Sequence, residues 1–103
     1  SFKENLQLLA SVDDIAQIDI VDTNGTIIDT IENKPGKQGS LVVYQYLAET
    51  FGSIDAKAAA HVLEVFAEHT ADAKNRPGAH PNIDRMLAII EGGAALNVQV
   101  VKA

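Results

Sequence analysis

The stretch Ile15-Ala-Gln-Ile-Asp-Ile-Val-Asp-Thr-Asn-Gly-Thr-Ile-Ile-Asp-Thr-Ile-Glu32 decides the fold, because two β-branched runs in it are separated by a turn sequence. Asn24-Gly25 between two such runs is the strongest short-range indication of a β-hairpin. We therefore predict strands at Ile15 to Val21 and at Thr26 to Glu32. Asp29 interrupts the apolar alternation of the second run.

Helical periodicity appears on both sides of the hairpin. Phe2 to Ser11 carries apolar residues at helical spacing and predicts a short amphipathic helix. Leu41 to Phe51 is apolar on nearly every side, with Ser40 suited to be its N-cap and Gly52 its stop. A helix of this composition is buried on more than one side, against a sheet and a helix or against a partner chain. A longer helix is predicted from Asp55 to about Lys74.

The remainder of the chain predicts a turn, a helix and a strand. Asn75 to Asn82 is a stiff turn, and either Pro81 at the first helical position or Asn82 as N-cap starts the next helix. The apolar face of that helix holds Ile83, Met86, Leu87 and Ile90. Leu96 to Lys102 alternates and predicts a third strand, antiparallel beside the hairpin.

The predicted fold is α+β, in one domain spanning residues 1–103. It has a small three-stranded antiparallel sheet, formed by the hairpin and the C-terminal strand and packed against three to four helices. The order of elements is α-β-β-α-α-α-β. With 103 residues, 47% of them hydrophobic, the chain is large enough for one core and too short for a second.

Composition excludes several classes of function. The chain has no cysteine, so it forms no disulfide, zinc–thiolate site, iron–sulfur cluster or thiol nucleophile. Its formal net charge of -6 argues against a nucleic-acid partner, because phosphate binding requires a surplus of Lys and Arg. No apolar stretch approaches membrane-spanning length, and no basic segment followed by an apolar run opens the chain. We therefore expect a cytoplasmic protein with no membrane partner.

The loop Asn33-Lys-Pro-Gly-Lys-Gln-Gly-Ser40 has the composition of an anion site. Glycine lets the backbone approach a ligand closely, and a helix N-terminus carries roughly half a positive charge. The loop therefore suits a phosphate or carboxylate. It lacks the residue order of a Walker motif and the dinucleotide fingerprint, so nucleotide hydrolysis is not supported.

A second loop is expected beside the first. Consecutive helices joined by short turns run antiparallel, so the helices that start at Ser40 and near Asn82 begin at the same end of the molecule. The loop from Lys34 to Ser40 then lies near the loop from Arg76 to Asn82. The predicted ligand-binding residues are Lys34, Gly36, Lys37, Gly39, Ser40, His69, Asp72, Arg76 and His80.

A purely structural interpretation competes with this one, because caps, turns and solvated lysines explain both loops. Ser-His-Asp catalysis has its residue types in Ser40, His69 or His80, and Asp72 or Asp84. Ser40 lies in no nucleophile elbow, and its role as a cap explains it. No residue is therefore assigned a catalytic role.

A metal site on the long helix is a weaker hypothesis. The candidate ligands are His61, Glu64, Glu68, His69 and Asp72. Their spacing matches no established ligand pattern such as His-Glu-x-x-His. We interpret His69 as a partly buried histidine that its neighbours hydrogen-bond, and we predict neither a metal nor a cofactor.

Three segments carry a family resemblance: Asn33 to Ser40, Glu68-His-Thr-Ala-Asp72 and Pro77-Gly-Ala-His-Pro-Asn-Ile-Asp-Arg85. The chain resembles, over almost its whole length, a family of short bacterial proteins, mainly proteobacterial, known only as a domain of unknown function. The resemblance implies a small single-domain bacterial protein. It implies no activity, cofactor or catalytic residue.

The leading functional hypothesis is a non-enzymatic binding or interaction module with a site for a small anionic or polar ligand. We expect a homo-oligomer, a dimer, because the helix after Ser40 has more apolar surface than one small sheet covers. The alternative is a small hydrolase-like enzyme, with or without a metal, that acts on an anionic metabolite. In that alternative Lys37 and Arg76 hold the anion and His69 or His80 moves a proton.

Overall fold

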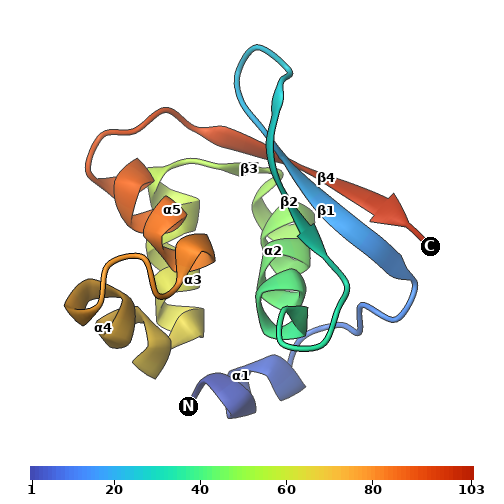
Figure 1. Cartoon of the computed structure of the whole chain (residues 1–103), viewed down its shortest axis with the longest axis horizontal. Coiled ribbons are helices and arrows are strands. Elements are labelled where there is room, and N and C mark those ends of the chain that lie inside the picture. Colours follow the sequence, from blue (N-terminus) through green and yellow to red (C-terminus); the bar gives the residue numbers. More distant parts are fainter.

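The computed structural model describes residues 1–103 and has five helices and a four-stranded antiparallel sheet (Figure 1). The elements in chain order are α1 (Phe2–Gln7), β1 (Ile15–Val21), β2 (Ile27–Glu32), α2 (Gln38–Phe51), β3 (Ser53–Ile54), α3 (Ala56–Phe66), α4 (Glu68–Asn75), α5 (Pro81–Ile90) and β4 (Leu96–Lys102). The α+β class is confirmed. No helix is long and apolar enough to cross a membrane.

The predicted hairpin is confirmed in its two strands and in its turn. β1 pairs with β2, and Ile18 lies opposite Ile31, so two buried isoleucines face the helices together. The Asp22 carboxylate accepts the N–H groups of Asn24 and Thr26, each at 2.9 Å. Gly25 has a φ of 85°, a conformation that glycine adopts without strain. The turn sequence therefore closes the hairpin, and the register of the pairing shifts between Ile20 and Val21.

The prediction of three strands and of the order α-β-β-α-α-α-β is wrong in two elements, because the structure has a further strand, β3, and a fifth helix. The sheet has the strand order β2-β1-β4-β3, and β3 contains only two residues. Gly52, with a φ of 79°, ends α2 and turns the chain back to the sheet, where Ile54 pairs with Leu96 on β4. Ile54 is fully buried. A strand this short has no periodicity that a sequence pattern could reveal.

Helix α2 lies between the sheet and α3, and Figure 1 shows the helices gathered on one side of the sheet. Its residues Leu41, Val43, Tyr44 and Leu47 are fully buried within the chain. Burial on two sides explains why this helix is apolar almost all round. Most of the apolar surface that favoured an oligomer is therefore covered by the chain itself, although Phe51 is 37% exposed, and the oligomeric state stays a prediction.

The helix after the glycine-rich loop begins earlier than predicted. α2 starts at Gln38 with Lys37 as its N-cap, and no side chain caps it, so the prediction that Ser40 is the N-cap is wrong. Gly36 has a φ of 86°, and the Lys37 N–H donates to the Lys34 carbonyl at 3.0 Å. This tight turn directs the chain into the helix before Ser40 is reached.

The long helix predicted from Asp55 to Lys74 is in fact two helices. Asp55 is the N-cap as predicted, but the helix is interrupted at Ala67, whose φ is 52°. Asn5 of α1 donates its side-chain N–H to the Val65 carbonyl at 2.9 Å, and the Thr70 hydroxyl donates to the Leu63 carbonyl at 2.6 Å. These bonds satisfy carbonyls near the break. The break therefore depends on a contact with α1.

Helix α5 begins with Pro81 at its first position, which was one of the two predicted starts. Its buried residues are Ile83, Met86 and Ile89, whereas Ile90 is 43% exposed. The predicted apolar face is therefore wrong at Ile90, because α5 packs mainly on α3 and presents Ile89 to it rather than Ile90.

Candidate functional site

The two loops flank one cleft of about 530 Å³. The loop before α2 and the first turn of α2 contribute Gly36, Lys37, Gly39 and Ser40 to its lining, and α4 and the loop after it contribute His69 and His80. α2 and α5 both begin at this end of the molecule, as their order along the chain predicts. The cleft brings together six of the predicted binding residues.

Unpaired backbone donors face this region. Gly39, Ser40 and Asn82 line the cleft and lie in the first turns of α2 and α5. Their N–H groups form no hydrogen bond within the protein. Free N–H groups at a helix start carry partial positive charge and hydrogen-bond an anion well.

The charged side chains of the lining add to the partial positive charge of these N–H groups. Lys37 is exposed at the N-cap of α2. The one carboxylate in the lining, Asp29 on β2, forms an ion pair with Arg85 of α5. The cleft is therefore locally cationic in a chain whose formal net charge is -6.

The two histidines of the lining belong to a group of packed rings that includes Phe2 and Phe66. Phe2 stacks on Phe66 with ring centroids 5.5 Å apart, and His69 meets the Phe2 ring edge-on at 4.8 Å. The His69 and His80 rings are 5.5 Å apart. A Cβ atom on Gly39 would come within 3.1 Å of the Phe2 ring, so this glycine allows α2 to approach Phe2 closely. The expectation that neighbours hydrogen-bond His69 is not met, since His69 packs against rings instead.

Asp72 and Arg76 lie behind the cleft wall rather than in the lining. Asp72 Oδ2 is 2.6 Å from His80 Nε2. Arg76 Nε donates to Asp72 Oδ1 at 2.8 Å, and Arg76 Nη2 donates to Asp72 Oδ2. These hydrogen bonds hold the pKa of Asp72 well below its ordinary value. The bond from Arg76 has the largest effect, and the bond from His80 the next largest. Arg76 thus binds Asp72 and is not part of the cleft lining.

Lys34 is the remaining predicted residue outside the cleft. It forms a surface ion pair with Glu32 at 3.1 Å. Lys34 therefore belongs to the same loop as Lys37 but does not line the cleft.

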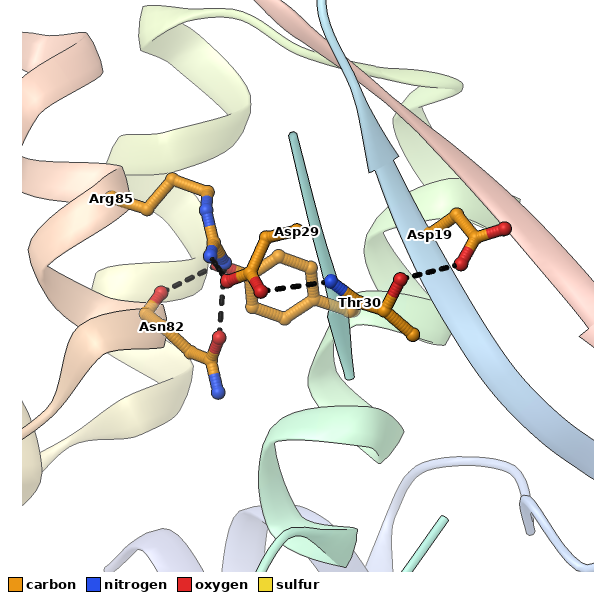
Figure 2. Close-up of polar contacts among 6 residues, drawn as sticks. Asp19, Asp29, Thr30, Asn82 and Arg85 are labelled. Carbon is orange, nitrogen blue, oxygen red and sulfur yellow. Dashed lines mark hydrogen bonds and ion pairs between the residues drawn. The ribbon is translucent and has the colours of Figure 1, made fainter. Parts of the chain in front are cut away.

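A polar network ties the hairpin to α5 at the same end of the molecule (Figure 2). Arg85, whose side chain is 12% exposed, donates to the Tyr44 hydroxyl at 2.9 Å, to Asn82 Oδ1 at 3.0 Å and to Asp29. The adjoining Thr30 donates its hydroxyl to Asp19 on β1 at 2.9 Å, which extends the network to the central strand. Asp29 interrupts the apolar face of β2 because it meets this arginine.

Tyr44 sits at the centre of that network. Its hydroxyl donates to the Asn82 carbonyl at 2.6 Å while it accepts from Arg85. Burial raises the pKa of Tyr44 to about 12, against the opposing effect of Arg85. The phenol therefore stays neutral and holds the start of α5 in place.

Sequence reasoning missed Phe2, Asp29, Asn82 and Arg85 as residues of the site region. The charge of Asp29 within an otherwise apolar run was the one usable indication, because a cationic side chain elsewhere in the chain can pair with it. Nothing local to Phe2 indicates that its ring lines a cleft. In the structure no three His, Asp or Glu side chains gather closely enough to hold a metal ion.

The comparisons with known proteins give a family and no activity. A family model described as "Uncharacterized protein conserved in bacteria (DUF2322)" matches residues 2–100. No curated protein and no solved structure matches the chain. The family match confirms the resemblance that the sequence shows to bacterial proteins of unknown function, and the function has to be argued from the cleft.

Proposed function

The chain belongs to this family of bacterial proteins, and we propose that it is a binding module that holds a small anionic molecule in the cleft between its two loops. The observation that carries the proposal is the convergence of unpaired backbone donors and one cationic side chain. Gly39, Ser40 and Asn82 offer free N–H groups, and Lys37 lies beside them. An anion in this position gains hydrogen bonds from groups that only water satisfies otherwise.

The size and lining of the cleft fit a small metabolite. Its volume of about 530 Å³ falls within the range of small-molecule sites, roughly 300 to 1,000 Å³. Ile31, Phe66 and Ile83 supply apolar contacts, so the ligand carries an apolar part as well as a phosphate or carboxylate. An ion pair already neutralises Asp29, which therefore does not repel the anion.

Thermal unfolding with a ligand panel tests this proposal. The panel holds inorganic phosphate, pyrophosphate and glutarate, with choline as a cationic comparison. A ligand specific for the folded state raises its stability, by about 2.7 kcal/mol at a hundredfold excess over Kd. We expect at least one anion to raise the Tm and choline to leave it unchanged.

Two lysine variants from the same loop provide a matched pair. Lys37→Gln removes the cationic side chain in the cleft and should abolish most of the shift. Lys34→Gln removes the lysine that pairs with Glu32 outside the cleft and should leave the shift intact. If no anion raises the Tm, or if both variants lose the shift equally, the cleft is not the anion site.

The predicted homodimer is a separate part of the proposal. Its remaining support is the exposed apolar pair Ile27 and Ile28 on the edge strand β2, 53% and 51% exposed, since edge strands can pair with a second chain. Sedimentation equilibrium over a range of micromolar concentrations tests it. A single species with the monomer mass would remove the dimer and leave the ligand site untouched.

A further inference from the structure

Three residues at the cleft wall form a chain of polar contacts that binding does not require. Arg76 holds both oxygens of Asp72, and Asp72 Oδ2 contacts His80 Nε2 at 2.6 Å. Asp72 and Arg76 do not line the cleft, while His80 does. Only the outermost member of the chain therefore meets a bound molecule.

The arrangement fixes which nitrogen of His80 acts. An ionised carboxylate only accepts hydrogen bonds, so in the neutral imidazole Nε2 carries the proton and donates it to Asp72. The lone pair then lies on Nδ1, which has no hydrogen-bond partner within the protein. The His80 side chain is 24% exposed, and His80 lines the cleft. A carboxylate that orients a histidine in this way prepares it as a general base.

Donors for a developing negative charge lie in the same cleft. Gly39, Ser40 and Asn82, whose N–H groups form no hydrogen bond within the protein, line it together with His80. Hydrolysis of a carboxylic ester needs a base that activates water and donors that stabilise the tetrahedral oxyanion. Both are present.

We propose that His80, oriented by Asp72, is a general base that hydrolyses a small anionic carboxylic ester bound in the cleft. This step rests on the proposed anion binding. Nδ1 takes a proton from water as the water oxygen attacks the ester carbonyl carbon. The carbon–oxygen bond to the alcohol then breaks, and the proton passes from His80 to the departing alkoxide. The products are a carboxylic acid and an alcohol, and His80 returns to its neutral state.

Release of 4-nitrophenolate from 4-nitrophenyl hydrogen glutarate, an ester with one free carboxylate, tests the proposal at neutral pH. Removal of a general base costs about 100-fold to 10,000-fold in rate. We expect His80→Gln to lower kcat by at least about 100-fold with little change in KM. His61→Gln is the control, because His61 contacts Tyr46 at 2.7 Å and does not line the cleft. It should keep the full rate.

Asp72 is a positioning residue and needs a separate readout. Asp72→Asn should lower kcat and alter the pH profile, while Asp72→Glu, which keeps a carboxylate, should recover part of the rate. A general loss of structure would affect both variants alike. Circular dichroism and thermal unfolding of every variant verify that the fold is retained.

Glutarate binding separates the two proposals, because glutarate resembles the acid product and cannot be hydrolysed. If the protein binds glutarate but cleaves the ester no faster than free imidazole at equal concentration, the catalytic proposal is overturned and the binding module stands. If His80→Gln and His61→Gln lose activity equally, His80 is not the base. If neither glutarate nor the ester binds, the proposed function fails as well.

Discussion

His80 Nε2 lies 2.6 Å from Asp72 Oδ2, and this contact fixes the loop before α5 to the face of α4. Arg76 completes the arrangement by binding both oxygens of the same carboxylate. The loop that brings His80 to the cleft is thus held at its start by Arg76 and at its end by His80. The orientation of the histidine and the shape of the cleft depend on one carboxylate.

The lowered pKa of Asp72 predicts an acid dependence of stability. Because its pKa in the folded state lies below the ordinary value of 3.8, its contribution is present above that pH and declines as the pH falls through the folded pKa. Wild type should therefore exceed Asp72→Asn in free energy of unfolding at pH ~5, by a margin that shrinks toward pH ~2. Urea denaturation of both proteins across this range measures the margin, and a constant margin would refute the assigned role.

Arg85 should be the ionic side chain that matters most for stability. Arg85→Met removes bonds to Tyr44, Asn82 and Asp29 at once, and bonds to charged groups contribute about 1.5 to 3 kcal/mol each. We expect a loss of about 2 kcal/mol or more in urea denaturation. Lys102→Met is the matched control, because it breaks a pair with Asp14 at the surface and should cost less than ~1 kcal/mol.

Arg85→Lys should lower the free energy of unfolding almost as much as Arg85→Met. A lysine ammonium has no planar fork and cannot reach the same partners together. If Arg85→Lys keeps full stability, charge alone is sufficient and the geometry of the network is not what stabilises the start of α5.

The backbone at Ala67 should be strained. Its φ of 52° is costly for a residue with a Cβ and free of strain for glycine. Ala67→Gly should therefore raise the free energy of unfolding by about 1 kcal/mol, in contrast to Ala71→Gly in exposed α4, which should lower it by about 1 kcal/mol. Urea denaturation compares the two. Equal losses would mean that the break between α3 and α4 is absent in solution.

Tyr44 predicts an alkaline limit to stability. Its pKa is raised from 10.0 to about 12, so the unfolded chain ionises this phenol first, and stability declines as the pH rises from about 10 toward 12. The chain has no tryptophan, so ultraviolet absorbance reports its two tyrosines directly. Tyr44→Phe should remove the step near pH 12. A wild-type titration complete well below that pH would show that Tyr44 is not buried.

The sequence predicts the fold well where structure is local. β1, β2 and β4 follow from alternation and from Asn24-Gly25. β3 has only two residues and exists because β4 offers it an edge. The break at Ala67 depends on the bond from Asn5 to the Val65 carbonyl, two residues that are 60 apart in sequence. Distant partners of this kind leave no periodic pattern.

The candidate site, like the fold, could be predicted only in part from the sequence. Helix order predicts that the two loops meet, because antiparallel packing follows from short connections. The roles within the site depend on side-chain partners. Arg76, predicted to hold an anion, binds Asp72, and Arg85 reaches a strand more than fifty residues earlier in the chain. Spacing along the sequence does not determine such pairs.

The most direct test of the central claim is a titration of the ¹⁵N-labelled protein with inorganic phosphate, pyrophosphate and glutarate, followed by amide NMR shifts. The claim is that both loops form one anion site. The account predicts that at least one of these anions causes saturable shifts at Gly39, Ser40 and Asn82 with a common Kd. Shifts at only one of the two loops, or no saturable shift at these three amides with any of the anions, would contradict it.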